Sequence, residues 1–216
     1  MIPMQYALRR RMMMAGGGGA LISKLPLGAL INVGTDGGAG TPNYEIADIN
    51  NFVLGGVVLV RKNIHSRSIF GRSTTYPGMP LDNKMASIYD SLPERLQSKI
   101  MDATFALEGS GSITRKVFAL TYTMAGFGNN GEVAEGKALQ LYTSNASRIK
   151  TLNGSATRWW LSSRYSTSRS RSVSADGTAN YDAPSISRGV VPAFAISSET
   201  LYDPTPNTDG SYNLIL

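Results

Sequence analysis

The sequence predicts a mixed α+β protein that is rich in loops and dominated by strands. Hydrophobic residues make up 42% of the 216 residues, which suffices for a buried core, whereas only 17% are charged and 23 positions are glycine. This composition is typical of a loop-rich protein with β-structure rather than of a helical bundle. Short β-branched or alternating segments recur along the chain, and two segments have the apolar spacing of helices. The length fits one domain with extensions, or two small domains.

Residues 1–15 are predicted to form a short helix. Met4, Leu8 and Met12 recur at intervals of four residues, and Gly16 ends the pattern. A helix this short is marginal in water by itself, so its methionine-rich face favours docking onto a partner protein; a frayed terminus is the alternative. The segment also resembles a signal peptide, but its apolar core is too short, and we expect it to be retained.

Residues 16–44 are predicted to form a Gly-rich linker or neck. They contain the runs GGGG and GTDGGAGTP around a modest apolar stretch, which is typical of a loosely structured connection. GTDGGAG has the glycine content of a phosphate-binding loop but lacks its Gly-Lys-Ser/Thr ending. We therefore expect a flexible loop there.

The compact domain is expected to cover residues 45–200, followed by a C-terminal tail at 201–216. It begins with NFVLGGVVLVRK (51–62), whose β-branched residues predict a strand or a hairpin broken by glycines. LDNKMASIYDSL (81–92) places its apolar residues on one face of a helix.

A second short helix is predicted directly afterwards. Ser91 and Glu94 fit a capping box, with Pro93 in the first turn. Leu96 and Ile100 continue the apolar face of this helix. Two short helices are therefore expected side by side in the sequence.

The rest of the chain is predicted to form strands joined by turns. Residues 169–175 (RSRSVSA) have serine at every second position and lead to Asp176-Gly177, which is a strong hairpin-turn signal. Pro192 indicates that the last strand lies at a sheet edge or a bulge. The predicted strands are KVFALTY (116–122), ALQLYT (138–143), RWWLSS (158–163), residues 169–175 and GVVPAFAI (189–196).

Composition excludes several kinds of chemistry. The chain has no cysteine, which excludes disulfides, thiolate metal sites and a cysteine nucleophile. The one histidine, His65, is not accompanied by a nucleophile-elbow motif, and we expect it at the surface. The sparse acidic residues form no calcium-binding loop of the D-x-D-x-D-G kind. We therefore expect no enzyme activity, no metal and no cofactor.

Charge and hydropathy narrow the choice of partners. The net charge is +6, but Arg9–Arg11 supply three of these charges, and the only other cluster is Arg164, Arg169 and Arg171. Nucleic-acid binding needs a stronger basic cluster, so it is not expected. No run of about 18 apolar residues is present to predict a membrane span.

The candidate binding surface follows two adjacent tryptophans. Neighbours on a strand point to opposite faces, so at least one tryptophan is expected in the core. The polar run after them is rich in Tyr, Ser, Arg and Asn, as antibody paratopes are. An ordinary solvated hairpin has the same composition, and the rigid flanking strands favour recognition. The expected contact residues are Tyr165, Arg169, Arg171, Asn180, Tyr181 and Asp182, and the expected scaffold residues are Trp159, Trp160, Gly177 and Phe194.

The motifs TRWWLSS, SVSADGTA and SRGVVPAFAI resemble those of a domain family of unassigned function found in Firmicutes and their phages. Members of that family have a Trp-Trp-Leu-Arg-Ser start, a Val-Asn-Ser-Asp-Gly turn and a Gly-Val-Arg-Pro-Ala-Phe end. The similarity covers residues 45–198 and includes YDSLPERL, KVFAL and LYTSNASR upstream. Ser162 and Val191 stand where the family has arginines, so any ligand role of those arginines does not carry over.

The arrangement also resembles the C-type-lectin-type fold, which formylglycine-generating enzymes share with the variable proteins of diversity-generating retroelements. The enzymes work through cysteine thiolates, which this chain lacks, whereas the variable proteins display a hypervariable surface for binding. The start MIPMQYALRRRMMMAGGGG resembles the N-termini of phage structural proteins.

These resemblances imply a phage virion protein of the tail or baseplate that binds a host cell-surface receptor, either protein or glycan. Residues 1–15 would dock onto other virion proteins, and the chain would form a homo-oligomer. It would be made in the bacterial cytoplasm and exposed on the particle. The alternative is a purely structural decoration, collar or tail protein, in which the Tyr and Arg side chains of the polar run would be buried between subunits.

Overall fold

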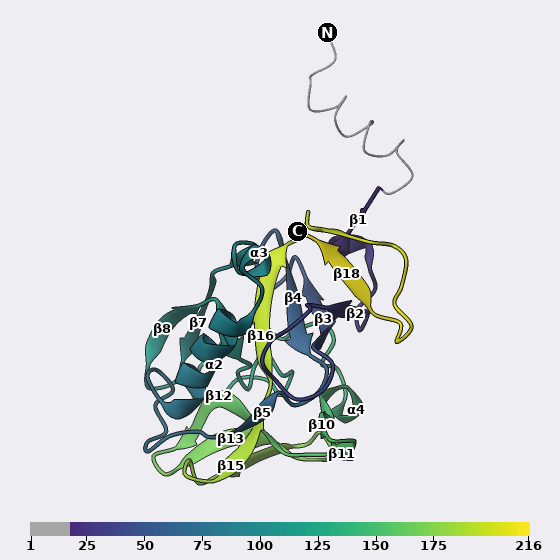
Figure 1. Cartoon of the computed structure of the whole chain (residues 1–216). Helices are drawn as coiled ribbons and strands as arrows, with labels where there is room; N and C mark the ends of the chain where they lie inside the picture. Colours follow the sequence, from purple (N-terminus) through teal and green to yellow (C-terminus); the bar gives the residue numbers. More distant parts are fainter. Residues whose placement is uncertain (1–17) are drawn as a thin grey trace.

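A nine-stranded sheet forms the centre of the protein (Figure 1). The computed structural model describes residues 18–216. Neighbouring strands of this sheet are antiparallel, except that β18 and β2 pair in parallel. In order, the strands are β1 (Ala20–Leu21), β17 (Leu201–Tyr202), β18 (Tyr212–Ile215), β2 (Leu30–Asn32), β3 (Asn43–Ile49), β4 (Gly56–Arg61), β16 (Pro192–Ser197) and β6 (Ile100–Met101), and β9 (Val117–Ala119) also pairs with β16.

A five-stranded sheet lies at the end of the molecule opposite β1 and β18 (Figure 1). It is antiparallel apart from one parallel pairing, between Trp159 and Gly189. Its strands in order are β14 (Ala179–Asp182), β13 (Arg169–Val173), β12 (Trp159–Ser166), β15 (Ser187–Val190) and β5 (Ser66–Ile69). Two separate hairpins pair β7 (Ala103–Leu107) with β8 (Gly111–Arg115) and β10 (Thr151–Leu152) with β11 (Ser155–Ala156). The prediction of a mixed α+β fold with mostly antiparallel strands is confirmed.

The helix predicted at 81–92 is confirmed. It is α2 (Pro80–Ser91), and it buries Leu81, Met85 and Ile88 on one face. The other helices within residues 18–216 are short, namely the 3-10 helix η1 (Ile22–Lys24), α3 (Glu94–Gln97) and α4 (Asn145–Arg148).

The second predicted helix is shorter than expected, and its capping box is wrong. α3 begins after Pro93 without a side-chain cap. The Oγ of Ser91 instead lies 2.7 Å from the backbone oxygen of Asp36 and 2.8 Å from that of Ile88. A buried backbone carbonyl needs a donor, so this long-range contact prevails over the local cap. Ile100, expected on this helix, lies in β6.

The predicted linker and tail are parts of the folded domain. Ile22 and Ile31 are buried, and β1 and β2 join the nine-stranded sheet. β17 and β18 pair with them from the other end of the chain. The predictions of a linker over 16–44 and a tail over 201–216 are therefore wrong for the described residues. The helix predicted over residues 1–15 lies outside the described part of the chain.

β4, β9, β12 and β13 confirm four of the predicted strands, but the strand predicted at 138–143 is wrong. These residues are irregular, with a turn at residues 140–141. The backbone N–H of Leu139 donates to the oxygen of Met124 (3.1 Å), and that of Leu141 donates to Ala47 (3.0 Å). The apolar residues of this segment are thus anchored by tertiary contacts rather than by a strand partner.

The last predicted strand is divided between the two sheets. The chain leaves the five-stranded sheet at Val190 and enters the nine-stranded sheet at Pro192, with Val191 between them. β16 pairs with β4 on one side and with β6 and β9 on the other, so the edge position, one of the two predicted alternatives, is wrong. Pro192 is the first residue of its strand, where a missing N–H is tolerated. The proline therefore marks the change of sheet.

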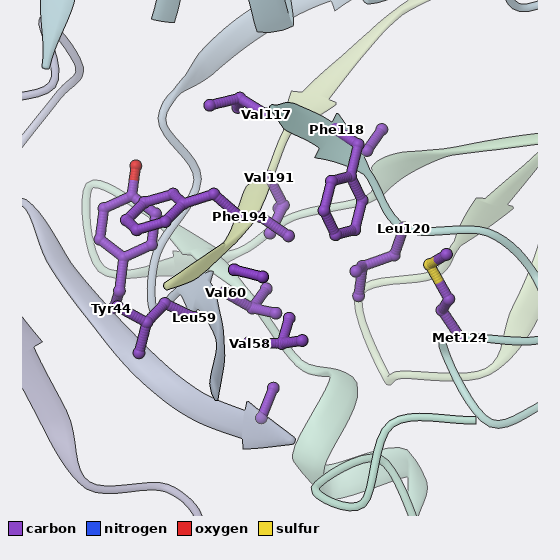
Figure 2. Packing of buried hydrophobic residues seen from close by; sticks show 14 of the residues in the cluster. Tyr44, Val58, Leu59, Val60, Val117, Phe118, Leu120, Met124, Val191 and Phe194 are labelled. Carbon is purple, nitrogen blue, oxygen red and sulfur yellow. The ribbon is translucent and has the colours of Figure 1, made fainter. Parts of the chain in front are cut away.

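The hydrophobic core packs against the nine-stranded sheet. Figure 2 shows aromatic and aliphatic side chains from β3, β4, β9 and β16 gathered together. The rings of Tyr44 and Phe194 lie 5.0 Å apart, and those of Phe105 and Phe118 lie 5.5 Å apart, between centroids. Burial of each large apolar side chain contributes about 1.5–3 kcal/mol, so this sheet is a rigid base for the smaller one.

Candidate recognition surface

Both tryptophans of β12 anchor the five-stranded sheet. Trp159 and Trp160 are fully buried, which confirms the prediction that at least one lies in the core. The indole N–H of Trp159 donates to the backbone oxygen of Arg148 (3.1 Å), and that of Trp160 donates to Ser68 (3.0 Å). Phe70 packs edge-on against Trp160, with ring centroids 5.7 Å apart. Each face of the strand is therefore fixed by a large ring whose polar atom is satisfied.

The turn between β13 and β14 is held by its own side chains. Asp176 accepts hydrogen bonds from the backbone N–H (3.0 Å) and the hydroxyl (2.7 Å) of Thr178. Gly177 has a φ of +83°, which only glycine adopts without strain. The Cβ of any other residue there would lie 1.9 Å from the backbone oxygen of Asn145 in α4. The predicted Asp-Gly turn is confirmed, and it is packed against a helix.

A column of stacked side chains rises from the sheet. The rings of Tyr165 and Tyr181 are parallel within 4° and 4.1 Å apart between centroids. The guanidinium of Arg171 lies between two rings, 4.4 Å from the centroid of Tyr165 and 4.0 Å from that of Tyr122. Tyr122 in turn stacks on Phe127 at 5.1 Å. Contacts of this kind are favourable, and they hold the outer tyrosines in place although these are 43% and 45% exposed.

Asn130 connects this column to a buried carboxylate. Its Oδ1 accepts a hydrogen bond from the Nε of Arg171 (3.0 Å), and its Nδ2 donates to the backbone oxygen of Arg164 (2.6 Å). The same Nδ2 lies 3.3 Å from an oxygen of Glu135 and 3.2 Å from one of Glu108. Burial raises the pKa of the Glu135 carboxyl. The guanidinium of Arg171 is thus positioned by a hydrogen bond as well as by the rings.

Asp182 does not present its side chain to a ligand, so its prediction as a contact residue is wrong. It is buried, and its carboxylate accepts hydrogen bonds from Arg188 (2.8 and 3.1 Å), Arg158 (3.0 and 3.2 Å) and the hydroxyl of Ser172 (3.0 Å). Burial by itself raises the pKa of this carboxyl, but the bonds from Arg188 and Ser172 outweigh it, and the pKa lies below its usual value. Asp182 therefore ties β14 to β13, to β15 and to Arg158, the residue that precedes β12.

The other predicted contact residues differ in exposure. Arg169 is exposed, whereas Arg171 and Asn180 are half-buried. Asn180 donates from Nδ2 to the hydroxyl of Ser174 (2.8 Å) and accepts from the backbone N–H of Tyr181 (2.8 Å). Asn180 therefore braces the hairpin, and the outward-facing residues are Tyr165, Arg169 and Tyr181.

Sequence reasoning missed Tyr122, Phe127 and Asn130. They lie far upstream of the polar run and reach it only through the fold. Tyr122 ends a predicted strand, and nothing in the local pattern distinguishes the other two.

His65 is buried, so the prediction of a surface histidine is wrong. Its Nε2 lies 2.8 Å from the backbone oxygen of Asp36 and its Nδ1 lies 2.9 Å from the hydroxyl of Ser66. Burial lowers the pKa of its imidazole. The carboxylate of Asp36 is already held by Arg61, at 2.5 and 3.2 Å, and by the hydroxyl of Tyr44 at 3.0 Å. The cluster braces the core, because the histidine is 2% exposed and its charged neighbours are paired.

The two positions that depart from the resembled family are buried. Ser162 lies beside the backbone oxygens of Ala119 (3.0 Å) and Leu120 (3.2 Å). Val191 is fully buried among apolar neighbours. Across residues 18–216, no group of three or more His, Asp or Glu side chains is placed to hold a metal ion, and no helix there is long and apolar enough to cross a membrane.

The fold and this surface define a mixed α+β domain with a rigid sheet that displays polar and aromatic side chains. Residues 50–198 match the family described as "Domain of unknown function (DUF6273)", which covers more than half of the chain. The chain belongs to this family, and its resemblance to a family of unassigned function is thereby confirmed. No curated protein and no solved structure matches the chain.

Proposed function

We propose that this chain is a phage virion protein of the tail or baseplate that binds a host cell-surface receptor through its five-stranded sheet. The observation that carries the proposal is the exposed pair of Tyr165 and Tyr181: their rings stack in parallel, and the guanidinium of Arg171 lies against Tyr165. Side chains that are already fixed lose little conformational freedom when a partner binds. Tyrosine and arginine at the centre of an interface commonly contribute 2 kcal/mol or more to binding.

The placement of the surface supports this role. The five-stranded sheet lies at the end of the molecule away from β1, the first strand of the described residues (Figure 1). Attachment to the particle through residues 1–15 would leave the sheet facing outward. We propose further that the scaffold is of the C-type-lectin type, since a hairpin near the C-terminus carries the exposed side chains on a small sheet.

The proposal is tested by adsorption to cells. Fluorescently labelled protein is incubated with Firmicutes cells, and the Tyr165→Ala, Arg169→Ala, Tyr181→Ala triple variant is compared with wild type. We expect the triple variant to lose adsorption while it stays folded, because all three side chains are exposed and the stacking contacts that it removes each contribute only about 0.5–1.5 kcal/mol.

A Tyr89→Ala, Arg95→Ala variant is the control, since it removes the same kinds of side chain from α2 and α3. It is expected to adsorb as wild type. If the triple variant adsorbs normally, this surface does not bind the receptor. The alternative of a purely structural virion protein would then be favoured, and it predicts that the triple variant no longer self-associates.

A further inference from the structure

We propose that the ligand of this surface is a saccharide that carries an anionic group. Its sugar ring would stack on the outer face of Tyr181, and its anion would pair with the guanidinium of Arg169. The inference rests on the proposed function, because it names the chemical class of the ligand for the same surface.

The column of rings has one open end. Tyr165 stacks on Tyr181 and also contacts the guanidinium of Arg171, whereas Tyr181, which is 45% exposed, has no second ring or cation stacked on it among the described residues. The face of an aromatic ring is electron-rich, and the C–H groups on the apolar face of a pyranose carry slight positive charge. The exposed face of Tyr181 is therefore suited to a sugar ring.

A single open ring also argues against single-stranded nucleic acid. Proteins of that class stack successive bases on several exposed rings along a groove. Here Tyr122 and Phe127 are half-buried, and the guanidinium of Arg171 lies against the ring of Tyr122. One stacking position fits one sugar ring.

Charge selects an anionic ligand. Neither Arg169 nor Arg171 has a carboxylate within 4.0 Å in the described part of the chain. Arg171 pairs across the strands with Tyr181, and Arg169 lies two residues along the same strand, so both belong to the same face of the sheet. The carboxylate of Asp182 is already bound by two other arginines. A carboxylate, sulfate or phosphate matches the planar guanidinium of Arg169.

Residues with hydroxyl side chains lie next to Arg169 in the hairpin between β12 and β13. Ser166 lies opposite Arg169 in the β12–β13 pairing, and Thr167 and Ser168 form the turn between them. Hydroxyls both donate and accept hydrogen bonds, which suits the hydroxyls of a sugar better than an apolar ligand. The proposed site binds its ligand without a metal ion.

Three polymers separate the two parts of the proposed ligand. Carboxymethyl dextran carries sugar rings and anions, dextran carries rings alone, and polyacrylate carries anions alone. Affinities of the full-length protein are measured by surface-immobilised binding at fixed ionic strength, with and without EDTA. We expect carboxymethyl dextran to bind at least tenfold more tightly than either dextran or polyacrylate, with no effect of EDTA.

Variants assign each part to a residue. Tyr181→Ala is expected to weaken binding of carboxymethyl dextran at least tenfold, whereas Tyr181→Phe keeps the ring and should bind as wild type. Arg169→Ala is expected to weaken binding of carboxymethyl dextran and leave the weak binding of dextran unchanged. Arg67→Ala is the matched control, because it removes an exposed arginine from β5 at the far edge of the same sheet.

The outcomes separate this inference from the proposed function. Equal binding of polyacrylate and carboxymethyl dextran, or tighter binding of an oligothymidine than of either, would overturn the anionic saccharide. So would a Tyr181→Ala variant that binds carboxymethyl dextran as wild type does. Loss of cell adsorption in the triple variant would support the receptor surface whatever the polymers show. If carboxymethyl dextran is then not preferred over dextran and polyacrylate, the receptor surface is kept and only the proposed ligand class is wrong.

Discussion

Replacement of Gly177 with alanine tests how the display hairpin is held against α4. The new Cβ would lie 1.9 Å from the backbone oxygen of Asn145 and 2.6 Å from its carbonyl carbon, so one of the two segments must move. The left-handed backbone costs alanine about 1–2 kcal/mol, and forcing an extra atom into a packed site typically costs another ~1–3 kcal/mol. We expect the free energy of unfolding to fall by about 2–5 kcal/mol in total.

Gly154→Ala is the matched control for the steric part. Gly154 has nearly the same φ, +81°, but its added Cβ would meet nothing within 4 Å. Only the backbone cost of about 1–2 kcal/mol remains there. Urea unfolding followed by the fluorescence of the two buried tryptophans gives both values. Equal destabilisation by the two variants would refute the close approach of the turn to α4.

Further predictions concern the core, the pH dependence and the N-terminal segment. Trp159→Ala and Trp160→Ala should each lower the free energy of unfolding by about 3–5 kcal/mol, and wild-type denaturation midpoints for both would contradict their role as anchors. Burial lowers the native pKa of His65 below its ordinary value of 6.5; the unfolded state therefore takes up a proton first, and stability should fall as the pH drops through 6.5. A His65→Gln variant should lose this dependence between pH 7 and 5.5, measured by urea unfolding. Deletion of residues 1–15 should leave the melting temperature unchanged but abolish incorporation into particles, and normal incorporation would remove the docking role.

Local patterns predicted the elements whose signals are carried by neighbouring residues. The apolar spacing of 81–92 indicated α2, and the Asp176-Gly177 pair indicated the hairpin turn. The same kind of reasoning failed where a distant partner decides the structure. Ser91 looked like a helix cap, but it bonds to Asp36, which lies far upstream in the sequence. Glycine runs looked like a linker, but the short strands between them pair with β17 and β18.

The candidate surface shows the same division. Its composition identified Tyr165, Arg169 and Tyr181, which the structure places outward, because exposed side chains are recognised by type alone. Composition could not separate them from Asp182, since a carboxylate in a polar run looks the same whether solvent or two arginines surround it. Nor could it find Asn130, which positions Arg171 across a large gap in sequence.

The sequence by itself thus determined the class of fold, the order of the main elements and the segment that carries the exposed polar residues. These follow from periodicity, turn chemistry and composition, all of which act over a few neighbouring residues. The tertiary structure decided which strands share a sheet, which charges are paired and which rings stack. Those depend on contacts between residues distant in sequence, such as Tyr122 with Arg171, and pairing energies of this kind exist only once the chain has folded.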